Sequence, residues 1–172
     1  GKAMGAKVIA GVSSPEKAAF ARELGADDFV IYPREIDKDG QKILSNQIKA
    51  ACGGDGANVV YDAVGGDYAE PAVRALAWEG RFLVVGFPAG IPRLPLNLTL
   101  LKSCQIVGVF WGAFTMRNPK RHAEHVAELF RWYEEGKVRP RITARYALKE
   151  AGEALKLVEG RSVRGKAVIL ID

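Results

Sequence analysis

The sequence is poor in cysteine and has no long apolar run. Its two cysteines, Cys52 and Cys104, lie far apart and form no Cys-x-x-Cys pair. This excludes a disulfide scaffold and a zinc site built from cysteines, and it favours a reducing, cytoplasmic setting. The longest uncharged apolar run, Gln105 to Met116, contains glycine and is much shorter than the roughly 20 residues that a bilayer span needs. We therefore expect no membrane partner.

Acidic residues are fewer than basic ones, 20 against 25, which gives a net charge of +5. Most basic residues are dispersed among acids, and the one local excess lies between Arg117 and Arg121. No RNA-binding or DNA-binding motif accompanies that excess, so nucleic acid is not an expected partner. The chain is 48% hydrophobic and 26% charged, which is typical of a globular domain. A phosphorylated small molecule remains a possible ligand for a basic surface of this kind.

The motifs that usually reveal a nucleotide site or a catalytic centre are incomplete or missing. There is no full Gly-x-Gly-x-x-Gly and no Walker A sequence, and Gly54–Gly56 precedes a predicted strand instead of following one. His122 and His125 are three residues apart on a predicted helix, but no third metal ligand is evident nearby. A Gly-x-Ser-x-Gly elbow is also missing. We therefore predict no metal site and no catalytic residue in this chain.

Short β-branched runs alternate with helical stretches, a pattern that predicts an α/β fold with parallel strands. The predicted strands are Lys7–Val12, Phe29–Tyr32, Ala57–Tyr61, Arg81–Val85, Gln105–Val109, Ile142–Tyr146 and Lys166–Ile171. Helices are expected over Ser14–Leu24, Gln41–Ala51, Tyr68–Trp78, Leu98–Lys102, Pro119–Glu135 and Lys149–Val158. Gly1–Ala6 is similar to the last turn of a helix with its glycine stop, which predicts further chain upstream.

Three short stretches could contact a ligand. Ser13 and Ser14 end the first strand where a dinucleotide fold often has an acid, and Lys17 follows one helical turn later. Hydroxyls and a cation could bind a phosphate there, or Ser14 could simply cap a helix. Gly65–Gly66 could let the backbone approach a ligand or could form only a tight turn. The aromatic group Phe110–Phe114 could be core or the wall of a pocket.

Five stretches together resemble one family. They are Lys7–Lys17, Leu24–Asp27, Val59–Gly66, Gly80–Phe87 and Gly165–Leu170. In this order they are similar to the C-terminal half of the medium-chain dehydrogenase/reductase superfamily, and most similar to its NADPH:quinone oxidoreductase branch. The resemblance implies a Rossmann-type, doubly wound parallel sheet that lacks its first strand and glycine-rich loop. Residues 1–138 would form this incomplete NADP-binding domain, and residues 139–172 would return to the catalytic domain.

The resemblance also implies a role for particular residues. Those assigned to NADP(H) are Ser13, Lys17 and Tyr32 at the 2′-phosphate, Val64 and Gly65 at the adenosine side, Gly86, Phe87 and Pro88 at the nicotinamide ribose, and Val109 and Phe110 near the ring. Ser14 is counted with the cofactor-binding residues because its hydroxyl could also donate to the phosphate. The strand Gln105–Val109 would form the edge of a homodimer. Despite the superfamily's zinc-dehydrogenase label, no zinc is expected in this branch.

The implied activity is hydride transfer from NADPH to a quinone or an activated alkene. An alternative within the superfamily is an NADP-dependent alcohol dehydrogenase or enoyl reductase. A second alternative is a nucleotide-binding module without catalysis, which the missing glycine-rich loop and the missing catalytic residues favour. In either case we expect the 172-residue chain alone to be inactive and to bind NADPH poorly.

Overall fold

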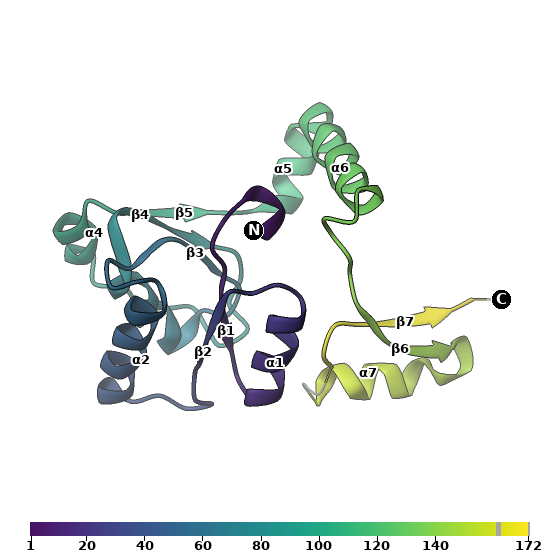
Figure 1. Cartoon of the computed structure of the whole chain (residues 1–172), viewed down its shortest axis with the longest axis horizontal. Coiled ribbons are helices and arrows are strands. Elements are labelled where there is room, and N and C mark those ends of the chain that lie inside the picture. The colour runs from purple at the N-terminus through teal and green to yellow at the C-terminus, as the bar shows by residue number, and fades with distance from the viewer. Residues whose placement is uncertain (161–162, 172) are drawn as a thin grey trace. The chain divides into compact units, whose positions relative to one another are not determined.

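The computed structural model describes residues 1–160 and 163–171. The chain divides into two compact units, the first comprising residues 1–119 and the second starting at residue 120 (Figure 1). The predicted functional boundary after residue 138 lies inside the second unit and stays a prediction. No helix in the described part of the chain is long and apolar enough to cross a membrane.

The first unit contains two groups of parallel strands. One pairs β1 (Ile9–Val12) with β2 (Asp28–Ile31), and the other has the order β3 (Ala57–Asp62), β4 (Leu76–Val84), β5 (Gln105–Gly108). Each pairing is parallel, with Val12 opposite Ile31 and Val84 opposite Gly108. Parallel strands require crossover connections, which the helices between them supply. The predicted α/β fold with a parallel sheet is therefore confirmed.

Helices connect these strands, and two of them start at side-chain caps. Ser14 accepts a hydrogen bond from the Lys17 backbone N–H (3.3 Å) and begins α1 (Pro15–Glu23). Asp37 accepts one from the Gly40 N–H (2.8 Å) and begins α2 (Lys38–Ala51). Both side chains satisfy N–H groups that have no partner within the helix. Further helical elements between the strands and after them are the 3-10 turn η2 (Gly66–Tyr68), α3 (Ala69–Arg74), α4 (Asn97–Lys102) and α5 (Trp111–Arg117).

The core of the first unit lies around the central strand β4. Leu76 and Phe82 of this strand are fully buried, together with Val73 of α3, and Leu98 of α4 is nearly so. Phe82 is buried because it packs in one cluster with Val73 of α3 and Leu98 of α4. The core thus anchors the three strands whose carboxyl ends carry part of the predicted site.

The structure corrects one predicted helix and adds another. The helix expected over Tyr68–Trp78 ends at Arg74, and β4 already starts at Leu76. The Ala- and Leu-containing run has high helix propensity, but Leu76 pairs with Ala57 of β3 and is fully buried there. Tertiary burial outweighs propensity in this segment. Helix α5 was not expected, because no side chain caps it and Gly112 lies in its first turn.

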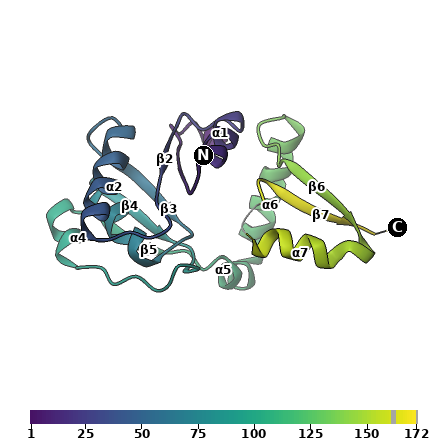
Figure 2. The same ribbon diagram turned by 90° about the horizontal axis from the view of Figure 1, so that it is seen from below.

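The second unit contains α6 (Pro119–Glu134), apart from its first residue, followed by a β–α–β arrangement. Strands β6 (Ile142–Ala147) and β7 (Lys166–Leu170) are parallel, with Arg145 opposite Val168. The 3-10 turn η3 (Leu148–Glu150) and helix α7 (Ala151–Glu159) connect them, and α7 lies along the two strands (Figure 2). Ala154 is the buried residue of α7. The predicted strand–helix–strand order of this segment is confirmed.

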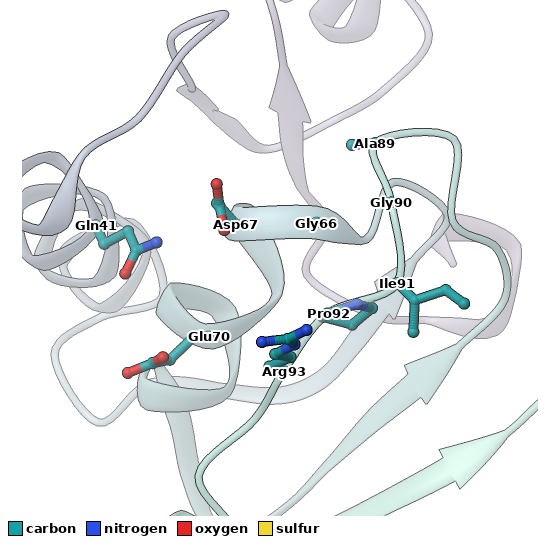
Figure 3. A pocket seen from close by; sticks show the side chains of 9 residues that line it. All are labelled: Gln41, Gly66, Asp67, Glu70, Ala89, Gly90, Ile91, Pro92 and Arg93. Carbon is teal, nitrogen blue, oxygen red and sulfur yellow. The ribbon is translucent and has the colours of Figure 1, made fainter.

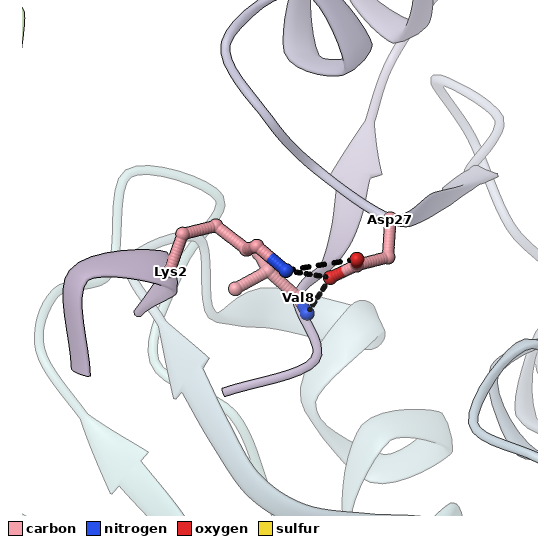
Figure 4. A network of polar contacts seen from close by, with 3 residues as sticks. All are labelled: Lys2, Val8 and Asp27. Atoms are coloured by element: carbon pink, nitrogen blue, oxygen red, sulfur yellow. Dashed lines mark hydrogen bonds and ion pairs between the residues drawn. The ribbon is translucent and has the colours of Figure 1, made fainter. Parts of the chain in front are cut away.

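The N-terminal segment is held to the first unit by Asp27 (Figure 4). Its carboxylate accepts two hydrogen bonds from Lys2 Nζ, at 2.8 and 2.9 Å, and one from the Val8 backbone N–H at 2.7 Å. Lys2 belongs to the 3-10 turn η1 (Lys2–Met4), which ends at Gly5 with a φ of 81°. These contacts hold η1 beside the start of β1. The predicted helical turn with a glycine stop is therefore confirmed.

We expect stability to depend on Asp27 at neutral pH and not at low pH. The hydrogen bond from Lys2, and next the one from Val8, lower the pKa of this carboxyl group. A lowered pKa in the folded state stabilises the protein above about pH 4, and this contribution is lost as the pH falls through the folded-state pKa. Asp27→Asn should therefore lower the melting temperature at pH 7, whereas at pH 2.5 the difference from the unsubstituted protein should shrink. A difference that stays constant between the two pH values would contradict this assignment.

Candidate functional site

The first part of the candidate site lies where β1 and β2 end. Ser13 follows β1 directly, and its Oγ accepts a hydrogen bond from Lys17 Nζ at 3.2 Å. Tyr32 follows β2, and its backbone N–H donates to the Val12 carbonyl at 2.9 Å. The carboxyl ends of parallel strands meet at one edge of a sheet, and ligands of doubly wound folds bind there. The structure thus places Ser13, Lys17 and Tyr32 on neighbouring strand ends at the start of α1.

The chemistry of this cluster suits an anion. Ser13 and Tyr32 carry hydroxyl groups, Lys17 carries a positive charge, and the N-terminus of α1 carries a partial positive charge. The Oγ of Ser14 already accepts the Lys17 backbone N–H, so Ser14 primarily sets where the helix begins. The position that follows β1 carries a serine and not a carboxylate, which would repel a phosphate.

The second part of the site is the turn after β3 and the loop after β4. The Asp62 carboxylate accepts hydrogen bonds from the backbone N–H groups of Val64 (2.9 Å) and Gly65 (3.1 Å). The Gly66 N–H donates to the Gly90 carbonyl (2.7 Å). The Ala89 N–H donates to the Val64 carbonyl (2.9 Å). These bonds bring Val64 and Gly65 against the loop that contains Gly86, Phe87 and Pro88.

Gly65 allows the two loops to approach closely. Its backbone has φ 71° and ψ −148°, a combination that is available essentially to glycine alone. A Cβ at this position would lie 2.7 Å from the Gly90 carbonyl oxygen and 3.2 Å from Phe87 Cα. The structure thus shows a tight turn after β3 that packs against the protein's own backbone, and a close approach to a ligand stays a prediction.

The third part of the site follows β5. The Val109 N–H donates to the Val84 carbonyl at 2.9 Å, which continues the pairing with β4. Phe110 precedes α5 and is 79% exposed, and Trp111 is 64% exposed. This exposure contradicts a role for Phe110 and Trp111 in the core of the first unit. Val109 and Phe110 directly follow the carboxyl end of β5.

Tyr68 connects the strand ends of the two groups. It lies in η2 after β3, and its hydroxyl group is 2.8 Å from the Pro33 carbonyl and 2.6 Å from the Arg34 carbonyl in the loop after β2. Its ring contacts Tyr32, with centroids 5.0 Å apart and planes inclined by 52°. Tyr68 thus fixes the loop that positions Tyr32 relative to β3.

We expect Tyr68→Phe to lower the free energy of unfolding by about 1 kcal/mol, the usual contribution of such a hydrogen bond. The ring contact with Tyr32 would remain, so the change isolates the hydroxyl group. Urea denaturation measures the loss, and Tyr61→Phe is a matched control because Tyr61 is 69% exposed. An equal loss in both variants would show that the hydroxyl of Tyr68 has no special role.

The concave region beside these loops is not lined by the predicted residues. It is a cleft of about 260 Å³. It is lined by Gln41, Gly66, Asp67, Glu70, Ala89, Gly90, Ile91, Pro92 and Arg93 (Figure 3). It adjoins the candidate site only through Gly66 and the loop around Gly90. The hydroxyl groups and the cation of the predicted anion cluster lie instead at the ends of β1 and β2, where Ser13 and Lys17 are hydrogen-bonded and Tyr32 follows the neighbouring strand. Among the described residues, no group of three or more His, Cys, Asp or Glu side chains could hold a metal ion.

Sequence reasoning missed Asp62 and Tyr68. Asp62 could have been found, because an aspartate that precedes a glycine pair directly after a strand is a common turn signal. Tyr68 could not, because its partners are carbonyl groups more than thirty residues away in the chain. Both residues position the candidate site and do not belong to the set assigned to the ligand.

Parallel strands joined by crossover helices, with hydroxyl groups and a lysine at the carboxyl ends of β1 and β2, are typical of a domain with the Rossmann-type fold. Residues 1–131 match the family described as zinc-binding dehydrogenase, and the chain belongs to this family. It is 38% identical over 167 residues to the quinone oxidoreductase-like protein 2 homolog of Nematostella vectensis. That match covers 96% of this chain and 44% of the relative, so the chain spans about half the length of the relatives it matches.

Solved structures agree with this assignment. Quinone oxidoreductase of Escherichia coli in complex with NADPH superposes with a TM-score of 0.81 at 28% identity, covering 99% of this chain and 51% of that enzyme. A mycobacterial protein in complex with NADPH superposes with a TM-score of 0.84 at 26% identity, covering 99% of this chain and 51% of the other. The resemblance to the quinone oxidoreductase branch and the Rossmann-type fold are therefore confirmed.

Proposed function

We propose that this chain is the cofactor-binding part of an NADPH-dependent oxidoreductase that reduces a quinone or an activated alkene. The observation that carries the proposal is the cluster of Ser13, Lys17 and Tyr32 at the ends of β1 and β2. Its hydroxyl groups and its cation match the 2′-phosphate that distinguishes NADPH from NADH. NADPH in two structural neighbours supports the same cofactor.

The other predicted residues would bind the rest of the cofactor. Val64 and Gly65 would line the adenosine side, Gly86, Phe87 and Pro88 would flank the nicotinamide ribose, and Val109 and Phe110 would lie near the ring. When bound, NADPH supplies the hydride. The protein's own contribution is to hold the donor and the acceptor in line and to exclude water. Asp62 and Tyr68 would keep the loops in place for this purpose.

The pairing of the strands supports a further strand in the complete protein. Within the described residues, β1 pairs only with β2, and β3 pairs only with β4. A parallel strand between β1 and β3 would join both groups into the six-stranded order of a Rossmann fold. The glycine-rich loop that follows such a strand would bind the pyrophosphate. We infer that this chain alone binds NADPH weakly, and titration calorimetry that gave a micromolar dissociation constant for it would disprove this inference.

One further feature concerns the oligomeric state of the enzyme. Strand β5 lies at the edge of its sheet, and all four of its residues are exposed, so we propose it as the edge through which a homodimer forms. Sedimentation of a β5 variant with a central proline, Val107→Pro, would then report monomers.

Cys52 and Cys104 are free thiols, which supports a reducing, cytoplasmic location.

The substrate class is tested with the protein at the full length that its gene encodes. We expect oxidation of NADPH, followed at 340 nm, with quinones or enones and little oxidation with aldehydes. Turnover of aldehydes and alcohols in place of quinones would assign the chain to the alcohol dehydrogenases of the same superfamily. Tight NADPH binding without any turnover across the panel would favour a non-catalytic nucleotide-binding module.

A further inference from the structure

A groove beside helix α2 carries an excess of positive charge that the proposed activity does not use. Its volume is about 760 Å³, and α2, α3 and α4 line it. The charged groups along it are Lys38, Lys42, Lys49, Arg74, Lys102 and Glu70. None of the residues predicted to bind the cofactor lines this groove. It is therefore a concave, basic surface separate from the ends of the strands.

The single acid of the groove is already paired. Glu70 accepts a hydrogen bond from Arg74 Nε at 2.8 Å, one helical turn away, and its carboxylate forms an ion pair with a terminal guanidinium nitrogen of Arg74 at 2.6 Å. This pair is internally neutral, so the remaining charge belongs to the four lysines. No carboxylate of the described residues forms an ion pair with Lys38, Lys42 or Lys49, whereas several other lysines of the chain, such as Lys2, do have such a partner.

The lysines converge because of where they lie on the helices. Lys38, Lys42 and Lys49 are four and eleven residues apart, which places them on one face of α2. Lys102 ends α4, and its Nζ donates to the Leu76 carbonyl at 2.7 Å, which holds the ammonium group against the groove. Burial, and next the positive charge of Lys49, lower the pKa of Lys102. The fold thus holds like charges near one another, and a bound anion would offset the electrostatic repulsion between them.

We propose that this groove binds a soluble organic phosphate that carries two or more phosphate groups. Several ammonium groups spaced along one groove match several phosphates, each of which is a strong acceptor for charged donors. The volume lies in the usual range for a small-molecule site. The lining contains no aromatic side chain on which a base could stack, so single-stranded nucleic acid is a poorer fit. The site is independent of the proposed NADPH site.

The probe for this site is sodium tripolyphosphate, titrated by calorimetry into the full-length protein at low salt with NADPH present at saturation. We expect one binding event that NADPH does not abolish and that weakens as salt is added. The double variant Lys42→Gln/Lys49→Gln should bind the probe about tenfold more weakly, because two charge-assisted contacts are lost. Lys149→Gln, which removes an exposed lysine from the second unit, is the control and should bind normally.

Controls on the double variant and competition with other ligands show whether the proposal is wrong. The double variant should keep its unfolding transition and its rate of NADPH oxidation, since neither lysine lies in the cofactor site. Binding that is equal in the double variant and the control would overturn the proposal. Loss of binding in the presence of NADPH would show that the probe occupies the cofactor site, which also overturns it. Binding of a single-stranded oligonucleotide or of phosphatidylserine vesicles in place of tripolyphosphate would do the same.

Discussion

Lys17→Ala should weaken the binding of NADPH on the order of tenfold to a hundredfold while changing the binding of NADH by less than about twofold. The ammonium group of Lys17 lies 3.2 Å from the Ser13 hydroxyl at the start of α1, where we place the 2′-phosphate. A hydrogen bond between a cation and a phosphate is among the stronger polar contacts in proteins. NADH lacks this phosphate, so the ammonium group contributes little to its affinity.

The substitution leaves the local backbone intact. Ser14 caps α1 through the backbone N–H of residue 17, which alanine retains, and alanine is the best helix former. Fluorescence titration of the full-length protein with both cofactors gives the ratio of the two dissociation constants. Arg22→Ala is a control on the same helix, because it removes an equal charge from a residue that pairs with Asp28 at 3.2 Å near the start of β2. Equal losses for NADPH and NADH in Lys17→Ala would refute the assignment of the 2′-phosphate.

The strands of the fold could be predicted because each is a compact β-branched run with turn residues at its ends. The helix start at Ser14–Pro15 could be predicted for a similar local reason, since the cap and the proline are visible in the sequence. The start of β4 could not, because Leu76 becomes a strand residue only through its pairing with Ala57. That contact depends on how β3 and β4 pack, which the local amino-acid composition does not indicate.

In the candidate site, too, some features follow from the local sequence and others depend on tertiary packing. Ser13 and Lys17 are four residues apart at a helix start, so their proximity follows from the sequence alone. The position of Tyr32 beside them depends on the parallel register that sets Ile31 opposite Val12. The contact of Tyr68 with the loop after β2 depends on the arrangement of both groups of strands. The residues assigned to a ligand could therefore be predicted from the sequence more readily than those that hold the loops in place.

Gly65→Ala should lower the free energy of unfolding by about 3 kcal/mol, since it combines backbone strain with a steric clash. The glycine is buried, with φ 71° and ψ −148°, and an added Cβ would lie 2.7 Å from the Gly90 oxygen. That oxygen belongs to the backbone and accepts the Gly66 N–H at 2.7 Å, so it cannot move away without breaking this bond. The loops after β3 and β4 should separate, and NADPH should bind more weakly as a result.

Gly90→Ala is the matched control for this change. Gly90 also has a positive φ, 106°, but no atom lies within 4 Å of the position of its Cβ. We expect it to lose only the strain of the backbone conformation, about 1–2 kcal/mol. Urea denaturation of both variants thus separates the clash from the strain, and the difference should appear as a lower midpoint for Gly65→Ala. If both variants lost the same stability, the loops would have room to accept a side chain at residue 65, and the inference that their close approach requires glycine there would be wrong.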